Sequence, residues 1–173
     1  VAVGRAAITI GGAEIAVEPG MFLQAVPEAE RILADLCVTA LPKRPKAIVD
    51  LFSGVGTLAI PLARRAAVTA FDSDKRAIAA LADAVRHTQG LKPVTARVRD
   101  LFREPLSARE LSGFDAAVFD PPRAGAAAQA ERLAVSKVPL VIAVSCNPAT
   151  LARDARALIE AITGRPVTGF VAP

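Results

Sequence analysis

Apolar runs and polar breaks alternate along most of the chain, and this pattern predicts a regular succession of strands and helices. Short continuous apolar runs indicate buried strands, whereas longer segments with an apolar residue every three or four positions indicate amphipathic helices. Strands are expected over residues 47–51, 68–71, 94–98, 114–119, 140–144 and 167–170, and helices over 57–66, 75–86, 127–136 and 148–162. Repeated strand–helix units of this kind are typical of an α/β fold with a doubly wound, mostly parallel sheet.

The first forty residues follow a different pattern. Residues 6–10 and 14–17 predict two short strands, and Gly11-Gly12 between them favours a β-hairpin. A helix is predicted over residues 27–39, with Pro27 in its first turn, and a proline-containing linker follows. We therefore expect an N-terminal hairpin and helix, residues 1–41, packed on a main α/β domain, residues 46–173. Since the first residue is Val1, we also expect a piece of a longer protein whose sheet lacks its last strands.

Composition and charge narrow the class of protein. The apolar fraction of 53% and the mean hydropathy of +0.40 exclude a disordered chain. No apolar run approaches the roughly 18 residues of a membrane span, and no signal peptide is recognised. The net charge of +4 suits an anionic partner such as RNA, although an arginine-rich surface without a partner gives the same charge. Two cysteines without metal-ligand spacing favour a reduced, cytoplasmic protein with no metal.

Acidic and other polar residues gather where the predicted strands end. They are Asp50, Asp72, Asp100, Asp120 and the segment Ser145-Cys146-Asn147-Pro148. Open parallel sheets bind ligands outside the carboxyl ends of their strands, so these residues are expected to share one site.

The segment Asp50-Leu-Phe-Ser-Gly-Val-Gly56 lies at the first strand-to-helix turn. Its two glycines let the backbone approach a ligand, and the amides of the next helix face the turn. Gly54-x-Gly56-x-x-Ala59 also matches the dinucleotide fingerprint, which leaves an NAD(P)-dependent oxidoreductase open. An acid directly before the loop would repel a pyrophosphate, whereas it would attract the ammonium and sulfonium charges of S-adenosylmethionine. The loop therefore favours the methyl donor.

Three further acids have separate expected roles. Asp72, at the end of the second strand, can accept hydrogen bonds from both hydroxyls of a ribose. Asp74 is expected to cap the N-terminus of the following helix. Asp100 is expected either to bind an adenine amino group or to cap a loop.

Two segments carry candidate chemistry for a second ligand. In Asp120-Pro-Pro-Arg123 the prolines hold the backbone extended, so the carboxylate can bind a base edge while Arg123 pairs with it or with a phosphate. Cys146 precedes a helix bearing Arg153 and Arg156, a positive environment that favours a nucleophilic thiolate. A cysteine after a buried strand is also often a small core residue, which is the role expected for Cys37. The single histidine, at position 87, is expected on the surface.

Taken together, four segments in this order resemble the RNA 5-methyluridine methyltransferase family. They are Phe22-Leu-Gln24, Asp50–Gly56, Asp120–Arg123 and Ser145–Pro148. The resemblance implies that residues 46–173 form a Rossmann-like domain that binds S-adenosylmethionine through Gln24, Asp50, Phe52, Ser53, Gly54, Gly56, Asp72, Asp100 and Asp120. It further implies that the target uracil is held by Asp120, Pro121 and Arg123, with Cys146 as the catalytic nucleophile.

The resemblance also implies a reaction on ribosomal or transfer RNA. The cysteine adds to C6 of a uridine, C5 attacks the donor methyl, and a base then removes the C5 proton. The family's glutamate base is expected beyond Pro173. Besides the oxidoreductase, two alternatives stay open: an amino-nitrogen methyltransferase, for which Cys146 is dispensable, and a non-catalytic RNA-binding module.

Overall fold

The computed structural model describes residues 6–23, 26–160 and 167–171, and these form an α/β fold with helices on both faces of one sheet. The strands of this sheet are β3 (Ala47–Leu51), β4 (Ala67–Asp72), β5 (Val94–Val98), β6 (Ala116–Phe119), β7 (Val141–Ser145) and β8 (Val167–Val171). The helices are α1 (Pro27–Ala40), α2 (Ala59–Ala63), α3 (Lys75–His87), α4 (Ala108–Leu111), α5 (Ala127–Ala134) and α6 (Pro148–Glu160).

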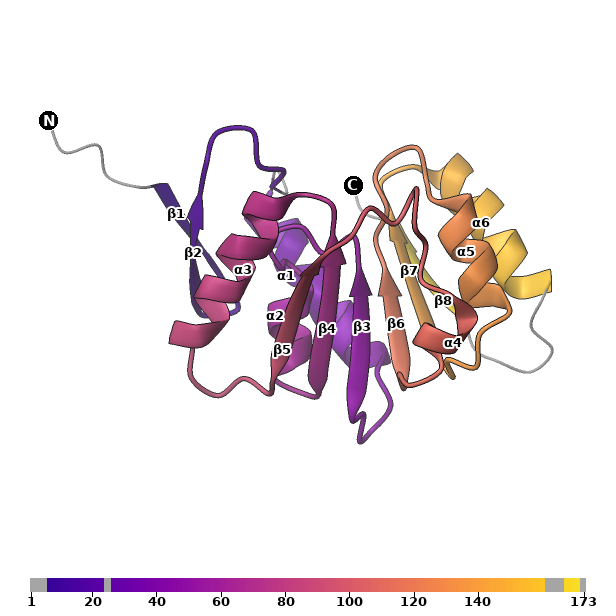
Figure 1. The fold of residues 1–173 in the computed structure, drawn as a ribbon, viewed down its shortest axis with the longest axis horizontal. Coiled ribbons are helices and arrows are strands. Elements are labelled where there is room, and N and C mark those ends of the chain that lie inside the picture. Colours follow the sequence, from indigo (N-terminus) through magenta and orange to yellow (C-terminus); the bar gives the residue numbers. More distant parts are fainter. Residues whose placement is uncertain (1–5, 24–25, 161–166, 172–173) are drawn as a thin grey trace, which may run out of the picture.

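The six strands run in the order β5-β4-β3-β6-β7-β8, and every neighbouring pair is parallel. In Figure 1 the arrowheads of β3 to β6 therefore point to the same edge of the sheet. The strand order reverses between β3 and β6, and such a switch point is where open α/β sheets bind ligands. The predicted doubly wound parallel sheet is confirmed.

Alternation of side chains along each strand divides the core into two clusters. Ile48 of β3 packs with the apolar residues of α1, α2 and α3, whereas its neighbour Val49 packs with those of α4, α5 and α6. The central strands are buried on both faces, which explains why they appear in the sequence as continuous apolar runs. Among the described residues, no helix has the length and apolarity needed to span a bilayer.

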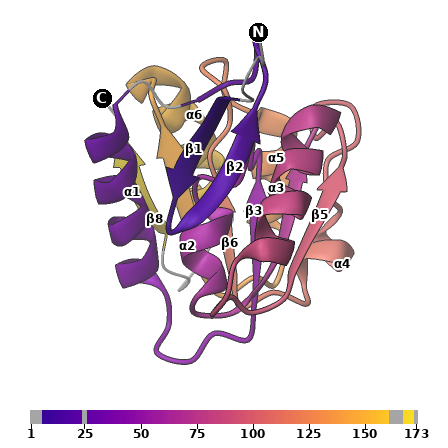
Figure 2. The ribbon, with the colours of Figure 1, turned by 90° about the vertical axis from the view of Figure 1, so that its left-hand side faces the viewer.

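The hairpin consists of β1 (Ala6–Ile10) and β2 (Ala13–Val17), paired antiparallel across Gly11 and Gly12. Both glycines have positive φ, at 54° and 85°, as tight hairpin turns require. Ile15 of β2 is fully buried, and Figure 2 shows the hairpin alongside α3. Arg64 beyond α2 donates a hydrogen bond of 2.6 Å to the Gly11 carbonyl. The division of the chain after residue 41 stays a prediction.

The largest differences from the sequence prediction concern two helices. Helix α2 begins at Ala59 rather than at residue 57 and ends at Ala63, because the preceding glycine turn and short-range bonds after Pro61 limit it to five residues. Helix α4 was not predicted, although Ser107 and Glu110 form a reciprocal capping box at its start. Hydrogen bonds from Arg99 and from Ser107 lower the pKa of Glu110 to about 2.

Candidate cofactor and substrate site

A cavity of about 570 Å³ opens at the carboxyl ends of β3, β4 and β6, beside the switch point of the sheet. Nine of the residues predicted to form the site line it together. They are Asp50, Phe52, Ser53, Gly54, Asp72, Asp120, Pro121, Arg123 and Cys146. The parallel topology therefore assembles one site from four separate segments of the sequence.

Two of the predicted residues that the structure describes, Gly56 and Asp100, are not in this lining. Gln24 lies outside the described residues. Gly56 has a φ of 98°, and a Cβ atom there would collide with the side chain of Leu81 on α3, so this glycine allows the loop to pack closely against the helix. Asp100 Oδ1 accepts hydrogen bonds from the amides of Phe102 and Arg103 at 3.0 and 3.2 Å. The predicted capping role is thus seen, and the contact of Asp100 with an adenine amino group stays a prediction.

The glycine loop is fixed to the end of β4. The Gly54 amide donates to Asp72 Oδ2 at 2.8 Å, and the Asp74 amide donates to Oδ1 of the same carboxylate at 2.8 Å. Each oxygen of Asp72 keeps a lone pair for a ligand hydroxyl. Gly54 has a φ of 54° and no described atom within 4 Å of where a Cβ would stand, so its backbone is open to the cavity. Asp74 caps α3 as predicted, accepting from the amides of the next turn.

Phe52 is the one non-glycine among the described residues that has a positive φ, at 66°. Backbone strain of this kind tends to occur at functional sites, and here it brings an aromatic ring to the cavity. The Phe52 ring packs against Phe102 and Phe119, with centroids 5.3 and 6.0 Å away. Phe102 is 50% exposed and also lines the cavity. Sequence reasoning missed this residue because an isolated phenylalanine in a loop has no periodic pattern.

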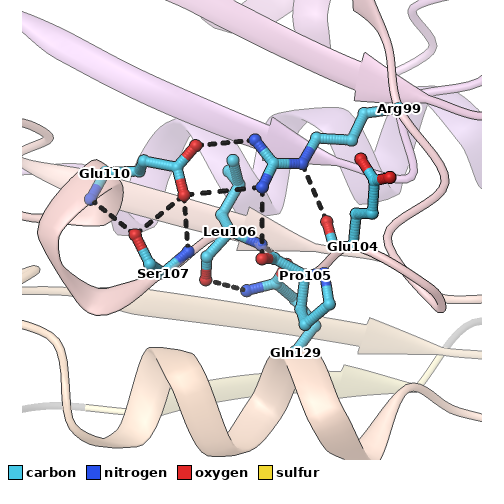
Figure 3. A network of polar contacts seen from close by, with 7 residues as sticks. All are labelled: Arg99, Glu104, Pro105, Leu106, Ser107, Glu110 and Gln129. Carbon is cyan, nitrogen blue, oxygen red and sulfur yellow. Dashed lines mark hydrogen bonds and ion pairs between the residues drawn. The ribbon is translucent and has the colours of Figure 1, made fainter.

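A polar network holds the loop that carries Phe102 (Figure 3). Arg99 donates to Glu110 at 2.6 Å and, through two other nitrogens, to two backbone carbonyls of the loop at 2.8 and 3.3 Å. The buried side chain of Gln129 accepts from the amide of Leu106 at 2.8 Å and donates to its carbonyl at 3.3 Å. The position of Phe102 therefore depends on contacts from both α4 and α5.

Of the four carboxyl groups that line the cavity, those of Asp50, Asp72 and Asp120 give it its electrostatic character. Asp50 is fully buried, and neither of its oxygens has a hydrogen-bond partner of good geometry among the described residues. Burial, together with the nearby charges of Asp120 and Asp72, raises the pKa of Asp50 to about 8, and the amide of Ala59 opposes this rise only in part. Burial likewise raises the pKa of Asp120 to about 6. Within the same described ranges, the hydroxyl of Ser53 is also buried without a partner. A positively charged ligand would satisfy these groups.

The two cysteines lie in opposite environments. Cys146 is exposed and lines the cavity at the start of α6, whereas Cys37 is buried in the core, as predicted. Burial raises the pKa of the Cys37 thiol to about 12, which makes that thiol unreactive. His87 is exposed at the end of α3, also as predicted. In the ranges that the structure describes, no group of His, Cys, Asp and Glu side chains is arranged to hold a metal ion.

Comparison with known proteins identifies the family. Residues 13–137 match the methyltransferase small domain. The chain belongs to this family. The methyltransferase domain is 51% identical over 165 residues to an uncharacterized RNA methyltransferase of Rhizobium meliloti, covering 95% of the chain and 39% of that protein. It is 36% identical over 144 residues to the 23S rRNA (uracil(1939)-C(5))-methyltransferase RlmD of Chromohalobacter salexigens, covering 82% of the chain and 30% of that protein.

A solved structure supports the same assignment. The Pyrococcus abyssi tRNA (uracil-54, C5)-methyltransferase, in complex with S-adenosyl-L-homocysteine, is 31% identical and has a TM-score of 0.75. The match covers 89% of the methyltransferase domain and 38% of the Pyrococcus chain. The domain thus spans well under half the length of each of these proteins. The predicted Rossmann-like methyltransferase fold and the resemblance to uracil-C5 methyltransferases are confirmed.

Proposed function

We propose that this domain transfers a methyl group from S-adenosylmethionine to C5 of a uridine in RNA, through a covalent adduct with Cys146. One observation carries the proposal: the exposed thiol of Cys146 lines the same cavity as the glycine loop and Asp120. The names of the relatives support RNA as the substrate and a uracil carbon as the target. Two free cysteines and an RNA substrate fit the cytoplasm, where we propose that the protein acts.

The cavity fits S-adenosylmethionine on two independent points. The unpartnered carboxyl of Asp50 suits a cation, and the methyl donor carries an ammonium and a sulfonium group. Gly54 leaves open space beside Asp72, whose oxygens can accept hydrogen bonds from ribose hydroxyls. When bound, the cofactor supplies an electrophilic methyl group. Phe52 and Phe102 exclude water from one wall of its site.

The uridine is assigned to the opposite side of the cavity. Asp120 and Arg123 hold the base edge and the RNA backbone, and in folded RNA the base first turns out of its stack. The thiolate of Cys146 forms a bond to C6, and the electron pair of the C5–C6 double bond would then form the bond from C5 to the methyl group, whose bond to the donor sulfur would break to leave S-adenosylhomocysteine. A base then takes the proton from C5, and the C6–S bond breaks to release the thiolate. We assign that base to no residue of this chain.

The test uses the complete protein with S-adenosylmethionine and an RNA that contains 5-fluorouridine. Fluorine at C5 prevents the proton removal, so the covalent protein–RNA adduct accumulates and is seen as a band that survives denaturing electrophoresis. The wild type and a Cys37→Ala control should form the adduct, and Cys146→Ala should not. An adduct that forms with Cys146→Ala refutes the assigned nucleophile.

The alternatives predict different outcomes. If Cys146→Ala still methylates RNA, and the product carries the methyl on an exocyclic nitrogen, the domain is an amino-nitrogen methyltransferase. Calorimetric binding of NAD in preference to S-adenosylhomocysteine would instead support an oxidoreductase. Tight RNA binding without methyl transfer in the complete protein would support a non-catalytic module.

A further inference from the structure

The loop between β6 and α5, residues 120–126, lies against the first turns of α6. Two side chains, one directly before α6 and one in its first turn, bond to one point of this loop. The carbonyl of Arg123 accepts from Asn147 Nδ2 at 3.2 Å, and the single proton of the Thr150 hydroxyl is shared between this carbonyl at 3.3 Å and the Asn147 carbonyl at 3.1 Å. The backbone at Arg123 is therefore contacted by two side chains of the segment that also carries Cys146.

Two more contacts hold the following residues of the loop. The guanidinium of Arg153 donates to the Ala124 carbonyl at 3.1 Å, and the Ala126 amide donates to Asp154 Oδ2 at 2.8 Å. Asp154 is only 2% exposed, and its other oxygen accepts from Arg153 Nε at 2.8 Å. A buried carboxylate is thus satisfied by one loop amide and one arginine.

The loop approaches α6 closely at Gly125. Its φ of 71° and its hydrogen bond of 2.7 Å to the Pro122 carbonyl define a tight turn. A Cβ atom at Gly125 would collide with the guanidinium of Arg153 and would lie 2.6 Å from Asp154 Oδ2. The backbone of the turn therefore rests directly on the side chains of α6.

Helix geometry explains why these side chains act together. Asn147, Thr150 and Asp154 are spaced at i, i+3 and i+7, which places them on one face of α6 and its N-terminal cap. We call Asn147, Thr150, Arg153 and Asp154 the α6 clamp. Within the described part of the chain, the hydrogen bonds from the clamp to other elements go to the loop after β6 and not to the glycine loop or to Asp72.

We propose that Asp154, through the α6 clamp, is a positioning residue that sets Arg123 at a fixed distance from the Cys146 thiol. The inference rests on the proposed function, since the two loops then carry the uridine and the nucleophile. Bond formation requires the reacting atoms to be held about 3–3.5 Å apart, and a displacement of about 1 Å can cost on the order of a hundredfold in rate. The clamp should affect adduct formation and leave cofactor binding unchanged.

The experiment compares Asp154→Asn, Asp154→Ala and Thr150→Val in the complete protein. Asp35→Asn is the matched control, because Asp35 also pairs with an arginine on a helix but lies on the surface of α1. With 5-fluorouridine RNA and saturating S-adenosylmethionine, each Asp154 variant should form the adduct about tenfold more slowly or worse. The dissociation constant of S-adenosylhomocysteine should change less than about threefold, and iodoacetamide should alkylate Cys146 at the wild-type rate.

Adduct formation at the wild-type rate by Asp154→Asn overturns the proposal, and so does a parallel loss of cofactor binding. If Asp154→Ala does not fold, Thr150→Val provides the test, because Thr150 is partly exposed and contributes only one bond to the loop. If the wild type forms no adduct, the proposed function fails, and the clamp is judged by amide hydrogen exchange. Asp154→Asn should then speed exchange at Ala126, and unchanged exchange there overturns the clamp itself.

Discussion

Replacement of Asp50 by asparagine should make the ligand-free protein less sensitive to alkaline pH. Within the described ranges the carboxyl is buried without a hydrogen-bond partner, and its pKa is raised from 3.8 to about 8. Between these values the folded state keeps a proton that the unfolded chain has released. The contribution of this group to the free energy of unfolding is therefore most favourable at low pH and falls as the pH rises toward 8.

The size of the effect follows from the pKa. Each pKa unit is worth about 1.4 kcal/mol, so between pH 5 and pH 8 this group lowers the free energy of unfolding by roughly 4 kcal/mol. The side chain introduced by Asp50→Asn carries no charge, and this part of the pH dependence would disappear. The new amide would still be buried without a partner, and this costs about 1–3 kcal/mol. The variant's gain in the free energy of unfolding at pH 8 is reduced by that amount.

Urea denaturation at several pH values from 5 to 8 measures this difference. The curve of unfolding free energy against pH should fall steeply for the wild type and for an Asp35→Asn control, and should be flatter for Asp50→Asn. The same variant should bind S-adenosylmethionine at least about tenfold more weakly, because the cation loses a carboxylate partner. If the curves for the variant and the wild type ran parallel, the raised pKa assigned to Asp50 would be refuted.

Three further predictions concern the cavity and its walls. The affinity for S-adenosylmethionine should rise from pH 6 to pH 8 more than the affinity for S-adenosylhomocysteine. The carboxyls of Asp50 and Asp120, whose pKa values are raised, ionise in this range, and only S-adenosylmethionine has a sulfonium. Calorimetric affinities that change equally with pH for the two ligands would contradict this. Gln129→Met should lower the free energy of unfolding by about 2 kcal/mol, because two buried backbone groups lose their partner; an unchanged Tm would count against the network. Gly54→Ala should cost only about 1 kcal/mol of stability yet weaken S-adenosylhomocysteine binding. Gly56→Ala, whose new Cβ atom collides with Leu81, should mainly lower the Tm. A lower Tm for Gly54→Ala together with weaker binding by Gly56→Ala would reverse their roles.

Much of the fold was predictable because its central strands are buried on both faces. The expected strand over 47–51 matches β3, and the helix expected over 75–86 ends one residue later in α3, with Asp74 as its cap. The short helices were harder. Helix α4 has four residues, too few to show an apolar period, and the one signal of its start in the sequence, the capping box of Ser107 and Glu110, was not used in the prediction.

The site was predictable where its residues stand at strand ends, because parallel strands bring those ends together. Asp50, Asp72 and Asp120 could be grouped on that basis alone. Residues whose roles depend on the path of a loop were not found. Phe102 reaches the cavity only because the loop after β5 turns back, and Asp154 reaches Ala126 only because the loop after β6 rests on α6.

The left-handed conformation of Phe52 has a consequence for protein engineering. A glycine would adopt this φ of 66° without strain, whereas phenylalanine holds it at a cost of about 1–2 kcal/mol. The ring contacts with Phe102 and Phe119 offset this strain, so a glycine introduced here would relax the backbone but strip the cavity of one aromatic wall. Libraries of variants of this domain should be screened for ligand binding as well as for stability at high temperature.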